Sequence, residues 1–76
     1  MVQVFPNPTT SAFTITGDLD SYTIELLDNL GRIQQRIQPA TATYTFDLSG
    51  LPNGLYMLHV FDNAGYKVEV QKIVKQ

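Results

Sequence analysis

The chain has 76 residues, a net charge of −2 and no cysteine. A chain of this length forms a single domain, residues 1–76, and its stability margin is thin because it buries only about 60–65% of its unfolded surface. Without cysteine it has neither a disulfide nor a thiolate metal site to add stability. The few scattered basic residues argue against a nucleic-acid partner, and no apolar run approaches the ~20 residues of a membrane span.

The first twenty residues predict two short strands. Residues 2–5 alternate and run into Pro6-Asn7-Pro8, where two prolines with fixed φ predict a stiff, extended element followed by a turn at Thr9-Thr10. Residues 13–16 alternate again as a half-buried strand. The polar loop that follows carries Leu19 as its one apolar residue.

The middle of the chain predicts a hairpin and a further strand. Residues 22–27 and 32–38 lie on either side of Asp28-Asn29-Leu30-Gly31, a hairpin turn in which Gly31 takes φ > 0. Residues 43–48 show the cleanest alternation in the chain. The returning hairpin strand has a solvated face made of Arg32, Gln34, Arg36 and Gln38. The residues expected inward are Phe13, Ile15, Tyr22, Ile24, Leu26, Ile33, Ile37, Tyr44, Phe46 and Leu48.

Residues 55–61 form the most apolar stretch of the chain. They follow a sharp turn marked by Gly50, Pro52, Asn53 and Gly54. One face carries Leu55, Met57, His59 and Phe61, and the other carries Tyr56, Leu58 and Val60. A strand without a polar face fits the middle of a sheet covered on both sides, or the core of a small sandwich. This stretch is therefore predicted to be the centre of the fold.

The C-terminal part predicts a second hairpin. Asp62-Asn63-Ala64-Gly65 repeats the earlier turn pattern between two strand-like runs. After it, residues 66, 68 and 70 are apolar and face one way, but Ile73 is out of phase. This predicts either a bulge near Gln71-Lys72 or a terminal strand with both faces partly covered. With about seven short strands and no helical periodicity, the chain is predicted to be a small all-β sandwich of antiparallel strands.

No pattern in the chain predicts catalysis, a metal site or a cofactor. His59 stands alone in an apolar strand without a partner for acid–base chemistry, and no nucleophile, phosphate or dinucleotide motif occurs. The aspartates are spread over turns, where carboxylates commonly bond the backbone: Asp18, Asp20, Asp28, Asp47 and Asp62. We therefore expect a protein that is not an enzyme and that binds no metal or cofactor.

The basic end of this acidic chain, Lys72-Ile73-Val74-Lys75, allows two interpretations. Lysines on an exposed terminal strand discourage edge-to-edge association. The same residues could instead form a recognition handle that adds to the sheet edge of a receptor.

Taken together, several blocks of the chain resemble the type A C-terminal sorting domain of cargo proteins of the type IX secretion system in Bacteroidetes. The blocks occur in the family's order from about Val2 to Lys75, and it is their combination that is specific. They are Val4-Phe5-Pro6-Asn7-Pro8-Thr9, Phe13 with Ile15, Asp28-x-x-Gly31-Arg32, residues 47–56, Gly65 and Lys72-Ile73-Val74-Lys75. Gln76 is a mild departure, since many members stop at or near the last lysine.

The resemblance implies an immunoglobulin-like sandwich that serves as a sorting signal. Such a domain follows a larger N-terminal cargo, passes through the periplasm and is read by the outer-membrane secretion machinery. A sortase-like peptidase then typically removes it and can join the cargo to anionic lipopolysaccharide, so the cargo is exported to the cell surface or the medium. The recognition residues implied by the resemblance are Pro6, Asn7, Pro8, Gly54, Tyr56, Lys72, Ile73, Val74 and Lys75.

Physical roles can be assigned to these residues as hypotheses. The two prolines stiffen the junction that follows the cleavage region, which is expected upstream of Val2. Gly54 supplies a backbone conformation that a Cβ would obstruct, and Tyr56 a large core contact with its hydroxyl at the rim. Residues 72–75 are expected to be the exposed signal. No signal peptide precedes the first strand, so the initial export signal is expected outside this sequence.

Two other classes of function fit a domain of this kind. An immunoglobulin-like adhesion or carbohydrate-binding module needs an exposed aromatic platform, for which Tyr22, Tyr44 and Tyr66 are candidates. Their alternation with polar residues places them inward more easily than outward. A structural spacer domain would not require the C-terminal end at all.

Overall fold

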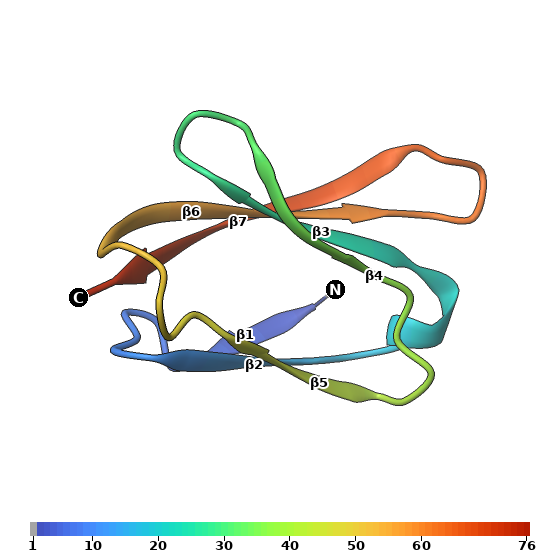
Figure 1. Ribbon diagram of the computed structural model, residues 1–76. Helices are drawn as coiled ribbons and strands as arrows, with labels where there is room; N and C mark the ends of the chain where they lie inside the picture. The colour runs from blue at the N-terminus through green and yellow to red at the C-terminus, as the bar shows by residue number, and fades with distance from the viewer. Residues whose placement is uncertain (1) are drawn as a thin grey trace.

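The computed structural model describes residues 2–76, which form two antiparallel sheets packed face to face (Figure 1). One sheet has the strand order β1-β2-β5 and the other β4-β3-β6-β7, which confirms the predicted all-β sandwich. A short 3-10 helix, η1 (Leu19–Ser21), precedes β3. No helix within residues 2–76 has the length and apolar character needed to cross a membrane. The strands are β1 Gln3–Phe5, β2 Ala12–Thr16, β3 Thr23–Asp28, β4 Ile33–Ile37, β5 Thr43–Asp47, β6 Gly54–Phe61 and β7 Lys67–Lys75.

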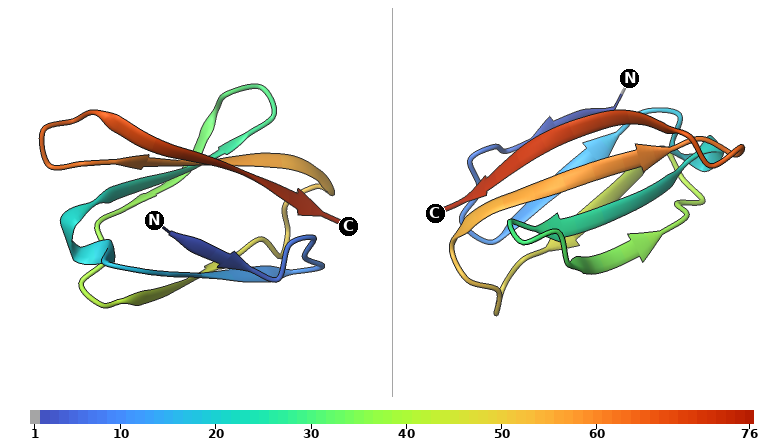
Figure 2. Two further views of the ribbon diagram at one scale, coloured as in Figure 1. Left: turned by 180° about the vertical axis from the view of Figure 1, so that it is seen from behind. Right: turned by 90° about the horizontal axis from the view of Figure 1, so that it is seen from above.

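The strand order is that of an immunoglobulin-like sandwich. The chain crosses between the sheets after β2, β4 and β5, so that β2 pairs with β5 and β3 pairs with β6. These pairings correspond to strands B with E and C with F of immunoglobulin domains, which confirms the expected class. As a result β1 and β7, at the two ends of the chain, lie on the same open side of the sandwich (Figure 2).

The core lies between the sheets and is built from the inward residues of both. Phe13 of β2 stacks on Phe46 of β5 with ring centroids 5.0 Å apart, and Tyr44 meets Phe46 edge-on. Leu19 of η1 is fully buried, as its place in the polar loop suggested. Strand β6 lies between β3 and β7, which confirms it as the centre of its sheet. The core residues are Val2, Phe13, Ile15, Leu19, Ile24, Leu26, Phe46, Leu48, Tyr56, Leu58, Val60 and Ile73.

One inward prediction on β4 is wrong. Ile33 is 50% exposed and pairs with Leu27, which lies on the outer face of its sheet. The register shifts beside this pair because Gln34 is an extra residue, a β-bulge, and such a shift moves the neighbouring side chain to the other face. Ile37, beyond the bulge, packs against the core as predicted.

The bulge predicted near Gln71-Lys72 is also wrong. Pairing of β7 with β6 is continuous over residues 69–75, and the register shift lies at Val68 instead. Ile73 is out of phase because it faces the core, whereas Val70 faces outward. The periodicity therefore changed because one face of β7 meets the core and the other is exposed, so the alternative prediction of a strand with both faces partly covered is wrong as well.

Both predicted hairpin turns form. The aspartate that opens each turn, Asp28 or Asp62, accepts backbone N–H groups at 2.9 Å from the residues two and four positions later. The glycines that close the turns have positive φ, +81° at Gly31 and +88° at Gly65. Tyr66 follows the second turn and is 71% exposed, so its predicted inward placement is wrong.

Candidate functional site at the terminal strand

The proline motif and the terminal lysine motif lie in direct contact, although they stand at opposite ends of the chain. Asn7 Nδ2 donates to Lys72 O at 2.7 Å, and Val74 N–H donates to Asn7 Oδ1 at 3.0 Å. The side-chain amide thus takes the place of a neighbouring strand's backbone on the free edge of β7. Thr9 continues this pairing, because its N–H donates to Val74 O and its carbonyl accepts the N–H of Gln76, both at 2.8 Å. We call residues 7–9 with these bonds the N-terminal clamp.

The clamp segment bends instead of running straight. Strand β1 ends at Phe5, residues 6–8 form a bend, and the Phe5–Pro6 and Asn7–Pro8 peptide bonds are both cis. The prediction of an extended element is therefore correct for β1 and wrong for residues 6–8. Thr9 is buried, and its hydroxyl donates to the carbonyl of Ala12, which ties the clamp to the start of β2.

Replacing Asn7 by alanine is expected to lower the free energy of unfolding by about 1–3 kcal/mol, because two hydrogen bonds to β7 are lost. Urea denaturation measures this change, and amide hydrogen exchange of Val74 should become faster at the same time. The matched control is Asn63→Ala in the exposed β6–β7 turn, where a change within about 0.5 kcal/mol is expected. Equal effects of the two substitutions would contradict the clamp.

The four residues of the terminal motif do not share one direction. Ile73 is fully buried in the core. Lys75 Nζ donates to two carbonyls of the turn that follows β5, at 3.0 and 2.6 Å, and so ties the end of β7 to that turn. Lys72 and Val74 point outward and are exposed. The expectation of an exposed signal over residues 72–75 is therefore correct for Lys72 and Val74 and wrong for Ile73.

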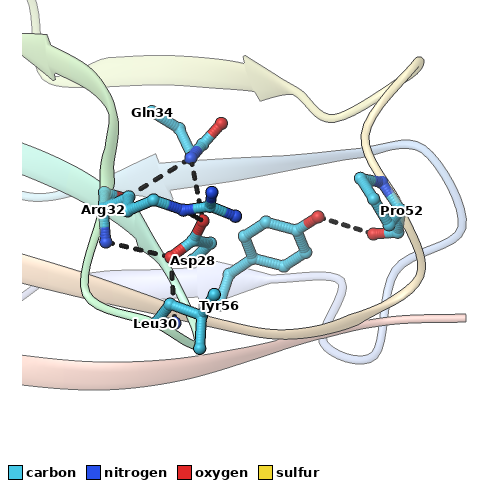
Figure 3. A network of polar contacts seen from close by, with 6 residues as sticks. All are labelled: Asp28, Leu30, Arg32, Gln34, Pro52 and Tyr56. Carbon is cyan, nitrogen blue, oxygen red and sulfur yellow. Dashed lines mark hydrogen bonds and ion pairs between the residues drawn. The ribbon is translucent and has the colours of Figure 1, made fainter.

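Gly54 and Tyr56 secure the crossing from β5 to β6. Tyr56 is 4% exposed, and its hydroxyl donates to Pro52 O at 2.5 Å (Figure 3). A tyrosine at the start of this strand that bonds the backbone a few residues upstream is the tyrosine corner of immunoglobulin-like sandwiches. Gly54 has φ +145°, which L side chains rarely adopt, although no neighbouring atom would lie within 4 Å of an added Cβ. The backbone conformation, and not a close neighbour, is the reason for glycine here.

Asp28 lies beside Tyr56, its pairing partner on β6 (Figure 3), and both residues line a small hollow of about 140 Å³. Its Oδ2 forms an ion pair with Arg32 Nε at 2.7 Å and accepts a bond from Gln34 Nε2 at 3.3 Å. The hollow is well below the 300–1,000 Å³ of typical small-molecule sites, so this network serves the turn. The hydrogen bond from the backbone N–H of Arg32 is the main reason that the pKa of Asp28 lies below its ordinary value.

Lowering the pH below about 4 is expected to destabilise the domain partly through Asp28. Because the pKa of Asp28 is lowered in the folded state, the unfolded state binds a proton more readily. The stabilisation of the fold by Asp28 is therefore complete above the ordinary aspartate pKa. It is lost as the pH falls through the pKa of Asp28 in the folded state. The stability difference between the wild type and Asp28→Asn, measured by urea denaturation, should therefore narrow between pH 7 and pH 3. A difference that stays constant would contradict this role.

Nothing in residues 2–76 forms a metal centre, since no three His, Asp or Glu side chains gather where they could hold an ion. Three aspartates instead bond the backbone of their own turns, namely Asp28, Asp47 and Asp62. His59 lies on the outer face of β6, paired with Glu25 and Val70, and desolvation followed by the charge of Lys67 lowers its pKa.

Sequence reasoning missed three residues of this site, Thr9, Glu69 and Gln71. Glu69 Oε1 accepts the N–H of Val2 at 3.0 Å, and Gln71 Nε2 donates to Val2 O at 2.6 Å. These bonds hold the start of the chain against β7. The available clue was that both polar residues share a face with Ile73, because polar groups on a core-facing side normally have partners.

One comparison with known proteins finds a family profile that matches nearly the whole chain. The profile of the family described as "Secretion system C-terminal sorting domain" matches residues 3–76. This range includes all seven strands, the N-terminal clamp and the residues of β7 that the clamp bonds. The comparison with curated proteins finds no match. The chain therefore belongs to the secretion system C-terminal sorting domain family, whose members mark proteins of Bacteroidetes for export by type IX secretion.

Proposed function

We propose that this domain directs an attached N-terminal cargo protein from the periplasm through the type IX outer-membrane translocon to the cell surface or medium. A sortase-like peptidase then removes the domain. The receptor recognises the outward side chains of the clamp and the terminal strand, and a second set of residues holds that surface in shape. The exposed set is Pro6, Asn7, Pro8, Lys72 and Val74, and the supporting set is Gly54, Tyr56, Ile73 and Lys75.

The convergence of three distant motifs on one end of β7 carries this proposal. Asn7 bonds the edge of β7 at Lys72, Gly54 pairs with Lys75, and Tyr56 pairs with Ile73. A receptor that contacts this end reads both termini of a folded domain at once. An unfolded chain presents no such surface, so the arrangement supports recognition of a folded domain over recognition of a linear tail.

An export assay tests the proposal. The domain is fused behind a periplasm-directed fluorescent protein in a bacterium with type IX secretion, and the medium and cell surface are compared with those of a secretion-null strain. Fluorescence outside the cell is expected only for the intact fusion in the competent strain. Periplasmic retention of the fusion with its domain folded would overturn the proposal.

Two exposed single substitutions make the assay specific for the terminal motif. Lys72→Ala is expected to reduce export, and Thr43→Ala, an exposed change on β5 in the other sheet, is expected to leave export unchanged. Both are expected to remain folded, because surface changes usually alter stability by no more than about 0.5 kcal/mol. Equal export of the two variants would exclude Lys72 from the recognised surface.

A further inference from the structure

Strand β7 is an edge strand of nine residues whose free edge is only partly occupied. The N-terminal clamp bonds Lys72 O, both backbone groups of Val74 and the N–H of Gln76. In an antiparallel strand, alternate residues point both backbone groups to the same edge. The N–H and C=O of Val70 and the N–H of Lys72 therefore lie on this edge as well, and no strand of residues 2–76 pairs with them.

An open groove of about 710 Å³ runs beside these free groups, between β1 and β7 (the β1–β7 groove). Its lining comes from Val2, Gln3, Val4 and Phe5 on one side and from Glu69, Val70 and Gln71 on the other. Phe5 is 50% and Val70 46% exposed at the two rims of this groove, because both lie on the outward faces of their strands. Figure 2 shows β1 and β7 side by side along this side of the sandwich. The groove thus offers valine and phenylalanine side chains next to unpaired backbone groups, and an extended strand can use both together.

The charge on β7 indicates what kind of strand fits. Of the basic side chains in residues 2–76, Arg32 and Arg36 are paired with carboxylates at 2.7 and 2.6 Å, and Lys75 donates to two carbonyls. Lys67 and Lys72 are exposed on β7, and no such pairing is found for either. The one carboxylate of β7, on Glu69, points the other way and accepts the N–H of Val2. The outer face of this edge is therefore basic on an acidic domain.

This charge disfavours a second copy of the chain as the partner. Two β7 edges in antiparallel pairing would bring the lysines of both copies into one short stretch, and like charges across strands are destabilising. A strand that carries carboxylates gains the opposite pairing with the same lysines.

We propose that an extended strand of the export receptor, with alternating apolar and acidic side chains, pairs with the free edge of β7 at Val70 and Lys72. Its apolar side chains enter the β1–β7 groove, and its carboxylates face Lys67 and Lys72. The pairing continues the edge that the N-terminal clamp already uses, so receptor strand and clamp together cover it. The partner's identity as a receptor rests on the proposed function, whereas the pairing of the edge does not.

The test is a titration of the ¹⁵N-labelled domain with two synthetic peptides, followed by NMR and amide hydrogen exchange. The probe is Ac-TVEVEVT-NH2, and the matched control is Ac-TVKVKVT-NH2. Chemical-shift changes and slowed exchange are expected at the amides of Val70 and Lys72. The lysine peptide should bind roughly tenfold more weakly, because two attractive cross-strand charge pairs become repulsive.

Three variants localise the effect. Val70→Pro removes an N–H that points away from β6, so peptide binding should be lost, while Val70→Thr keeps both the N–H and the branched Cβ and should bind as the wild type does. Lys72→Glu changes only an exposed charge and keeps the test independent of the folding of Val70→Pro. It should reduce the preference for the acidic peptide or reverse it.

Each outcome of the peptide titration tests the pairing at the free edge of β7 independently of the export assay. Shifts at Val70 and Lys72 that depend on the N–H and on the charge of residue 72 would support the edge pairing, even if the fusion failed to be exported. Shifts centred on the edges of β4 or β5, equal binding of the two peptides, or no binding at millimolar peptide would overturn it. In that case a successful export assay would still leave the sorting function standing.

Discussion

Tyr56→Ala is expected to lower the free energy of unfolding by about 3–5 kcal/mol, since it removes a buried aromatic ring and leaves a cavity. The domain as a whole is expected to have about 4–11 kcal/mol, at 0.05–0.15 kcal/mol per residue. This single change therefore removes a large share of the total stability. Urea denaturation and near-ultraviolet circular dichroism measure the loss.

The matched control is Tyr56→Phe, which keeps the ring and removes only the hydrogen bond to Pro52 O. It should cost about 0.5–1.5 kcal/mol and leave the domain folded. If the tyrosine corner is structural, the export of the Tyr56→Phe fusion should stay close to that of the wild type. A folded Tyr56→Phe domain that is not exported would show that the hydroxyl is read directly.

Ile73→Ala is expected to cost about 2–5 kcal/mol, because this side chain is fully buried between the sheets. Truncation after Gln71 should be more severe still, since it also removes the clamp contacts and the bonds of Lys75 to the turn after β5. Thermal unfolding of the purified domain measures both effects. We expect the truncated domain to be unfolded at 37 °C.

Val74→Thr, on the exposed side of the same strand, serves as the control for Ile73→Ala. Its cost should stay within about 0.5 kcal/mol, because it keeps the branched Cβ and the backbone bonds to Asn7 and Thr9. A loss of export after truncation thus cannot distinguish a missing signal from an unfolded domain. Export should therefore be compared in folded variants with substitutions at Lys72 and Val74. Equal losses of stability in Ile73→Ala and Val74→Thr would contradict the description of β7 as a strand with one buried and one exposed face.

The sequence by itself determined the local structure and the class of the fold. The alternation of residues 43–48 and 55–61 predicted strands β5 and β6, and the Asp-Asn-x-Gly pattern predicted both hairpin turns. These features depend on backbone preferences and side-chain bonds within four residues, so a local pattern contains them. The resemblance to the family also identified the motif residues in the sequence. It did not distinguish the motif residues that are exposed from those that are buried or bonded within the fold.

The tertiary structure decided which face each residue occupies at the sheet edges and which distant residues meet. Ile33 turned outward because the extra residue Gln34 matters only once β4 pairs with β3, and pairing partners lie outside any local window. Ile73 became a core residue because its pairing with Tyr56 places it on the face of β7 that meets the other sheet. The bonds of Asn7 to Lys72 and Val74 exist only because the immunoglobulin-like topology brings β1 and β7 to the same side of the sandwich. A contact between the two ends of a chain is a property of the packed fold, since no local preference of either segment encodes the other.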